Sequence, residues 1–135
     1  MVSGGNATVF VANMGRAVRF YTEVLDLKLT NRFGDDWATV TAGSGLTIGL
    51  HPASPKYPAP GTKGAVTIGL EIDMPIDRAV ARLSEKGVQI KGTVTRSEPG
   101  NFVSLEDPDG NDIYLWEVNR LTVPETDLAH AGAAK

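Results

Sequence analysis

Residues 106–117 read EDPDGNDIYLWE, and this stretch decides the fold. Its first half predicts a turn, because Pro108 fixes φ, Gly110 accepts a positive φ, and Asp and Asn side chains bond their own backbone. In its second half, Ile113 and Leu115 point to one side of a strand and the residues between them point to the other. The stretch therefore predicts a hairpin turn and a strand with one core face and one partly aromatic face.

The same pattern occurs earlier in the chain. A shift of 65 residues places Ile113 on Ile48, and a shift of 61 places Leu70 on Val9. The offsets differ by four (65 − 61), which predicts a longer loop in the second copy, within residues 91–101. Self-similarity of this kind indicates two copies of a unit of about sixty residues.

Each copy is predicted to have the element order β-α-β-β-β. In the first copy, alternation over 6–12 predicts a strand and helical spacing over 15–25 predicts a helix, with Asn13 as its cap and Asp26 in left-handed geometry at its end. A strand from Leu27 and a hairpin complete this copy. The second copy is expected to have strands over 65–72 and around 88–90, a helix over 76–86 and the closing hairpin.

The predicted fold is α+β, with two βαβββ modules whose curved mixed sheets surround a cleft and whose helices cover the outer faces. Four prolines and two glycines over 52–64 predict a semi-rigid linker. The predicted organisation is a first module at 1–51, a linker at 52–64, a second module at 65–117 and a C-terminal tail at 118–135.

The strand faces opposite the predicted core carry rings, hydroxyls and small residues, which is typical of a binding cleft. The candidate ligand-binding residues are Asn6, Thr8, Phe10, Trp37, Thr39, His51, Thr67, Glu71, Phe102, Tyr114 and Trp116. Alternatives stay open for several: His51 as a loop residue, Glu71 as a solvated strand end, and Tyr114 as a plug. The acidic turn at 107–111 lacks the length and the later Glu of an EF-hand, so a turn is favoured over a calcium loop.

The composition of the chain limits the classes of partner that it is expected to bind. The chain has 135 residues, a net charge of −3 and a pI near 5.3, which argues against a nucleic-acid surface and permits a cationic partner. It has no cysteine, no apolar run long enough for a membrane span and no signal-peptide pattern, so a cytoplasmic protein is expected.

The chain resembles the vicinal oxygen chelate superfamily, which includes glyoxalase, bleomycin resistance proteins and extradiol dioxygenases. The resemblance rests on residues 9–14 (VFVANM), 17–27 with its Phe-Tyr pair, 68–73 (IGLEID) and 107–111 (DPDGN), and it covers 6–117. It implies the two-module fold just described, but not any one chemistry, because this fold hosts many.

The resemblance also implies where a metal would bind. Metal-dependent members place His or Glu at four inward strand positions, and these positions hold Asn6, Gly49, Thr67 and Tyr114 here. None is an imidazole or a carboxylate, and neutral oxygens alone bind a divalent transition metal weakly. We therefore expect no metal, no other cofactor and no assigned catalytic residue.

The resulting hypothesis is a metal-free aromatic cleft that binds a small molecule, aromatic or cationic, in the manner of the bleomycin-resistance type, which sequesters an antibiotic. An alternative is a lyase- or isomerase-like enzyme related to glyoxalase, with a non-standard metal site or with His51 or Glu71 as base. A third is a dimerisation module whose cavity is filled by side chains. A homodimer is predicted, because relatives of this fold close the cleft by pairing modules.

Overall fold

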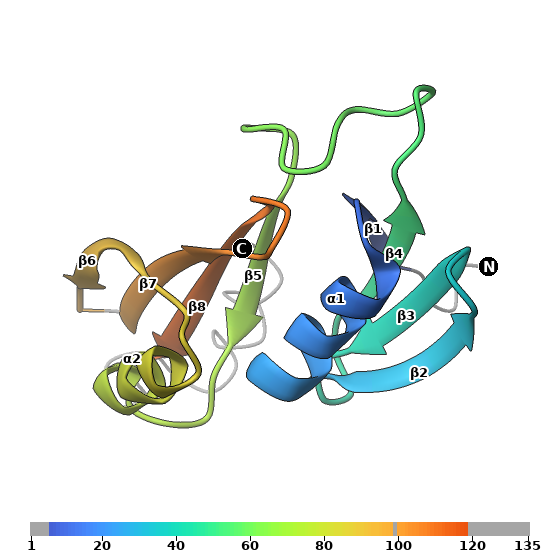
Figure 1. The fold of residues 1–135 in the computed structure, drawn as a ribbon. Coiled ribbons are helices and arrows are strands. Elements are labelled where there is room, and N and C mark those ends of the chain that lie inside the picture. Colours follow the sequence, from blue (N-terminus) through green and yellow to red (C-terminus); the bar gives the residue numbers. More distant parts are fainter. Residues whose placement is uncertain (1–5, 99, 119–135) are drawn as a thin grey trace, which may run out of the picture. The chain divides into compact units, whose positions relative to one another are not determined.

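The computed structural model describes residues 6–98 and 100–118 and divides into two compact units. The first unit comprises Met1–Val66 with Asp107–Asn111, and the second comprises Thr67–Glu106 with Asp112–Lys135. Each unit contains a four-stranded mixed sheet and an α-helix, so the α+β class is confirmed (Figure 1). The predicted tail lies outside the described residues except for Val118.

The sheet of the first unit has the order β1-β4-β3-β2. Its strands are β1 (Ala7–Val11), β2 (Lys28–Phe33), β3 (Trp37–Thr41) and β4 (Thr47–Pro52). β1 runs parallel to β4, and the other two pairings are antiparallel. The predicted hairpin of this copy is confirmed as β3 and β4.

The helical segment of the first unit is α1 (Met14–Arg19), continued by a π-helical turn (Phe20–Val24). Asn13 caps it as predicted, because its Oδ1 accepts the Arg16 N–H at 2.9 Å. The wider turn is closed by the Leu25 N–H, which donates to the Phe20 carbonyl five residues back at 3.2 Å. Asp26 then takes φ 62°, which confirms the left-handed residue expected at the helix end.

The second unit repeats this order. Its elements are β5 (Thr67–Glu71), α2 (Ile76–Glu85), β6 (Lys91–Arg96), β7 (Gly100–Glu106) and β8 (Asp112–Val118), and its sheet has the order β5-β8-β7-β6. β5 runs parallel to β8, as β1 does to β4. The internal repeat is therefore confirmed.

Two predictions for the second unit are wrong. The strand expected around 88–90 does not form there, because the Val88 N–H donates to the Leu83 carbonyl at 2.9 Å and closes the helix end. The segment 91–101 is not a loop but consists mainly of β6 and the start of β7. Extra residues are absorbed within the sheet, since the five residues from Lys91 to Thr95 lie opposite only three, from Ser104 to Phe102.

Each sheet packs one face against its helix. In the first unit α1 contacts β3 and β4, and in the second α2 contacts β7 and β8. Both cores are built by alternate strand residues, as predicted. The buried strand residues are Val9, Val11, Ala38, Val40, Ile48 and Leu50 in the first unit, and Ile68, Leu70, Val103, Leu105, Ile113 and Leu115 in the second. We call the opposite face of each sheet its non-core face.

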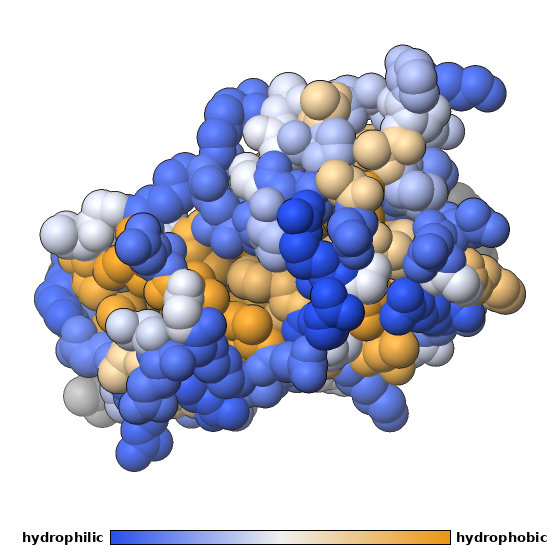
Figure 2. Space-filling view, in the orientation of Figure 1, coloured by the Kyte–Doolittle hydropathy of each residue, from blue (hydrophilic) through white to orange (hydrophobic). Residues whose placement is uncertain are grey.

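Some large apolar side chains remain at the surface. Figure 2 shows apolar atoms between hydrophilic ones on the face in view. The exposed large apolar residues are Leu29, Phe33, Leu46, Tyr57 and Val66. No helix within residues 6–98 and 100–118 has the length and apolar content needed to cross a bilayer.

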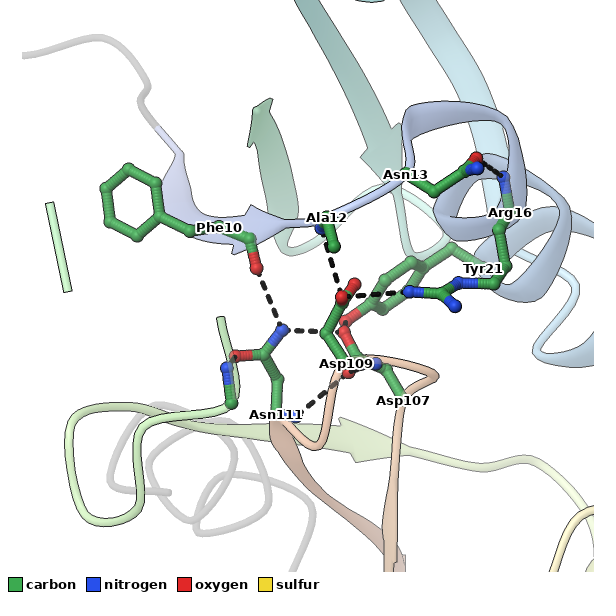
Figure 3. A network of polar contacts seen from close by, with 9 residues as sticks. Phe10, Ala12, Asn13, Arg16, Tyr21, Asp107, Asp109 and Asn111 are labelled. Atoms are coloured by element: carbon green, nitrogen blue, oxygen red, sulfur yellow. Dashed lines mark hydrogen bonds and ion pairs between the residues drawn. The ribbon is translucent and has the colours of Figure 1, made fainter. Parts of the chain in front are cut away.

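The turn at 107–111 is organised around one buried carboxylate, Asp107 (Figure 3). Its Oδ1 accepts the backbone N–H groups of Asp109 and Asn111, each at 2.9 Å. Its Oδ2 accepts the Tyr21 hydroxyl at 3.0 Å and the Asn111 side-chain amide at 2.8 Å. The acidic sequence therefore serves a turn, because protein donors occupy both oxygens of Asp107.

The same turn bonds to the strand, helix and linker of the first unit. Asp109 Oδ1 accepts the Ala12 N–H and the Arg16 guanidinium, both at 3.0 Å (Figure 3). Asn111 Oδ1 accepts the Gly61 N–H at 3.1 Å. Gly61 has φ +77°, and a β-carbon there would lie 1.9 Å from the Asp109 carbonyl oxygen, so only glycine fits. Residues that are distant in sequence are thereby fixed in one compact unit.

Candidate functional site

The non-core face of the first sheet carries a row of aromatic side chains. Strand register places Phe10 beside His51 and Phe33 beside Trp37. The Trp37 and His51 rings lie 6.3 Å apart, centroid to centroid, which joins the two pairs across the sheet. Phe10, Trp37 and His51 are half-buried and Phe33 is 62% exposed. The predicted site residues of β1, β3 and β4 are therefore together on one face.

Sequence reasoning missed a fifth ring, Tyr57, which comes from the linker. It stacks on Phe10 with a centroid distance of 4.7 Å and an interplanar angle of 17°, and it meets His51 edge-on at 5.1 Å. Tyr57 is 43% exposed. The linker is held close by bonds from Gly61 and Lys63 to the turn at 107–111. The sequence shows that Tyr57 lies in a proline-rich linker, but it does not predict where the tyrosine ring packs.

His51 is held in one tautomer by its own strand end. Its Nδ1 lies 2.8 Å from the Pro52 carbonyl oxygen, and a carbonyl oxygen only accepts, so Nδ1 carries the proton. In the neutral ring, Nε2 is then an acceptor. The ring also stands edge-on to Phe10, with an interplanar angle of 73°. His51 is thus the polar member of the aromatic row.

Gly49 provides the floor beneath Trp37. A β-carbon at position 49 would lie 2.3 Å from Cη2 of the indole and 3.0 Å from Asn6 Oδ1. The indole therefore fills the volume that a side chain at position 49 would take. Any larger residue there must displace Trp37.

Hydroxyl groups form the neighbouring rows of this face. Thr30, Thr39, Thr41 and Thr47 make a ladder in which Oγ1 atoms lie 2.8 Å (30 to 39), 3.3 Å (30 to 41) and 3.1 Å (41 to 47) apart. Thr8 donates to Asn6 Oδ1 at 3.0 Å. Two strand positions span about 7 Å, so hydroxyls begin about that far from the aromatic row. A flat molecule on the rings would meet neutral polar groups at its edge.

The second sheet has a related but more tightly filled non-core face. Phe102 lies 4.3 Å from Trp116 and 6.1 Å from Tyr114 between ring centroids. Trp116 is buried, while Phe102 and Tyr114 are half-buried. The Tyr114 ring covers Gly69, where a β-carbon would lie 2.3 Å from its hydroxyl oxygen. Burial raises the pKa of the Tyr114 phenol. Tyr114 thus fills space in its own sheet.

Charged groups mark both ends of this second face. At one end, Lys91 Nζ lies 3.2 Å from Glu106 and 3.0 Å from Asp112, and these contacts raise the pKa of the lysine. At the other end, Glu71 is an exposed residue paired in register with Trp116. Exposed Thr67 pairs with Asp112, at the same end as Lys91. The predicted residues Thr67, Glu71, Phe102, Tyr114 and Trp116 thus belong to the second sheet.

Comparison with known proteins agrees with this geometry. The model of the Glyoxalase/Bleomycin resistance protein/Dioxygenase superfamily matches residues 5–115. This chain belongs to that superfamily. No curated protein matches the chain.

Three solved structures illustrate the range of the glyoxalase/bleomycin resistance superfamily. TnmS3, an antibiotic binding protein from Streptomyces sp. CB03234, is 27% identical, with 88% of this chain and 99% of that chain covered and a TM-score of 0.68. A glyoxalase/bleomycin resistance protein from the same organism is 29% identical, with 83% and 99% covered and a TM-score of 0.62. A lactoylglutathione lyase from Agrobacterium tumefaciens shares the fold at 17% identity, with 85% and 92% covered and a TM-score of 0.67.

The metal positions of the superfamily do not fit a metal in this chain. In the first sheet, position 49 is a glycine whose side-chain volume the Trp37 indole occupies, and Asn6 Oδ1 already accepts the Thr8 hydroxyl. In the second sheet, Tyr114 lies over Gly69 and Thr67 offers only a hydroxyl. The described residues contain no group of three or more His, Asp or Glu side chains placed to hold a metal ion. These donors are neutral, and neutral oxygens alone bind a divalent transition metal weakly.

Proposed function

We propose that the non-core face of the first sheet binds a flat aromatic small molecule and that the protein sequesters this ligand without transforming it. The carrying observation is the cluster of four partly exposed rings, Phe10, Trp37, His51 and Tyr57, on a sheet whose other face already packs its core. The description of TnmS3 as an antibiotic binding protein supports an antibiotic as the ligand.

The expected affinity follows from the rings. Stacking of a flat base on one aromatic side chain contributes about 1–3 kcal/mol. Stacking on Trp37 and on one ring of the Phe10–Tyr57 pair would contribute about 2–6 kcal/mol, compared with roughly 8 kcal/mol for micromolar binding. Gly49 leaves room for the indole to lie over the sheet, where a flat ligand could stack on it.

A panel of planar aromatic antibiotics, with thioester metabolites as a second class, tests the proposal by thermal shift and tryptophan fluorescence. We expect a planar compound to raise the melting temperature and to quench Trp37. Trp37→Ala and Phe10→Ala should each weaken its binding about tenfold or more, since each removes one stacking contact.

Leu46→Ala is the matched control, because Leu46 is an exposed apolar residue outside the aromatic row. It should leave the affinity unchanged. Phe102→Ala in the same assay reports on the second sheet. Equal affinity of Trp37→Ala and wild type for every compound that binds would contradict the proposed surface.

An enzyme is the second candidate, and one observation favours it: His51 Nδ1 donates to Pro52, so in the neutral ring Nε2 is an acceptor among the rings. This nitrogen has the chemistry of a general base. Chromatography can detect whether a bound compound is converted to a product. Conversion by wild type but not by His51→Gln would support an enzyme over sequestration.

We also propose a homodimer. β2 is the edge strand of the first sheet and exposes both Leu29 and Phe33, which leaves apolar surface at an unpaired edge. Light scattering at tens of micromolar protein is expected to give twice the chain mass. The mass of a single chain at that concentration would contradict it.

A further inference from the structure

The aromatic row contains an open hydrogen-bond acceptor, the ring nitrogen Nε2 of His51. Its sister nitrogen Nδ1 donates to Pro52, and Nε2 has no partner among the described residues. It is not one of the buried side-chain atoms that lack a partner, so it faces accessible space. An accessible hydrogen-bond acceptor between apolar rings suits a ligand that has a hydrogen-bond donor.

The surroundings define what kind of donor fits. The described residues on the non-core face of the first sheet include no carboxylate: they are rings, threonines, Asn6, Gly49 and, on β2, Asn31 and Lys28. A cationic donor finds no opposite charge there, whereas a neutral O–H group needs none. The net charge of the whole chain therefore does not predict the charge of the ligand that this face binds.

The geometry joins the donor to an aromatic ring. Phe10 and Tyr57 lie nearly parallel, and His51 touches both edge-on within 5.5 Å. A hydroxyl attached directly to a flat ring lies in the plane of that ring. One rigid molecule can therefore contact Phe10 or Tyr57 through its face and His51 through its edge. No flexible part of the ligand then has to be ordered on binding.

We infer that the ligand is a neutral hydroxyaromatic compound whose phenolic O–H donates to His51 Nε2 while its ring lies against Trp37 and one ring of the stacked Phe10–Tyr57 pair. This inference rests on the proposed function and adds the chemical class. His51 is thus the residue that selects among flat ligands of similar size.

A matched pair of probes tests the inference: 2-naphthol, which has the donor, and 2-methoxynaphthalene, which lacks it. Titration calorimetry on the full chain should give about tenfold tighter binding of 2-naphthol, the worth of one hydrogen bond at the upper end of its usual range. In His51→Phe, which keeps a ring and removes the acceptor, the ratio of the two affinities should fall to near one. His130→Phe, the same change at the only other histidine, should leave the ratio as in wild type.

The outcomes separate the two proposals. If neither probe binds, the proposed function fails, and this inference fails with it. If both bind and the ratio is the same in wild type and His51→Phe, the inference fails while the proposed function stands. A ratio that falls in His130→Phe would also overturn the assignment to His51.

A measurement on the wild type guards against a variant that does not fold. Long-range proton–nitrogen correlation spectra of the imidazole should show His51 as the Nδ1–H tautomer at neutral pH. Addition of 2-naphthol should shift the Nε2 resonance, and 2-methoxynaphthalene should not. An Nε2–H tautomer, or equal shifts from both probes, would overturn the inference.

Discussion

Asp107→Ala is expected to lower the free energy of unfolding by about 3 kcal/mol, since hydrogen bonds to a charged group contribute about 1.5–3 kcal/mol and several are lost at once. For a chain of this size, that corresponds to a fall in melting temperature of roughly 10 °C. The cause is the buried carboxylate, which satisfies the Tyr21 hydroxyl and three donors of its own turn. Circular dichroism during heating measures the change.

Two companion variants make this result interpretable. Asp36→Ala removes an exposed aspartate and should change stability by less than about 0.5 kcal/mol. Asp107→Asn keeps the shape but turns an amide nitrogen toward existing donors, so it should also destabilise, though less than Ala. Wild-type stability in Asp107→Ala would show that the turn does not depend on its carboxylate.

Alkaline solution is expected to destabilise the protein through Tyr21. Burial, and then the neighbouring charge of Asp107, hold the pKa of Tyr21 far above its ordinary value near 10. A pKa that is higher in the folded state stabilises the fold fully below the unfolded pKa, and that stability is lost as the pH rises above it. Above about pH 10 this group should therefore remove about 1.4 kcal/mol per pH unit.

Denaturant unfolding at pH 9, 10, 11 and 12 tests this slope, with phenolate absorbance as a second readout. Tyr21 should ionise only as the chain unfolds. Tyr21→Phe is the control: it is less stable at pH 8 because it loses the bond to Asp107, but its stability should fall less steeply above pH 10. Equal slopes for Tyr21→Phe and wild type would contradict the assignment.

The sequence predicted the features that depend on local periodicity. Alternation in Val9-Phe10-Val11 and in the closing strand identified the core faces, and the internal repeat predicted the same sheet order in both units. Asp26 and Asn13 were predictable because caps and helix ends have strong local preferences. These signals lie within a few residues of the structure that they describe.

Features set by distant contacts were not predictable. The place of Tyr57 depends on Gly61 and Lys63 bonding a turn some fifty residues away in the chain. The start of β6 depends on a bulge that only pairing with β7 defines. The tautomer of His51 depends on a carbonyl orientation at Pro52. In each case the residue type can be read from the sequence, but the partner that positions the residue cannot.

The glycine under Trp37 has a consequence for how this chain and its metal-binding relatives diverge. The indole and a metal-binding side chain at position 49 compete for the same volume, so one protein cannot hold both. A change from Gly49 to glutamate collides with the ring, and loss of Trp37 alone removes a stacking surface without creating a ligand. A carboxylate at position 49 therefore requires a second change at Trp37. The Trp37 indole and a metal-binding side chain at position 49 thus exclude each other, although both need the same backbone.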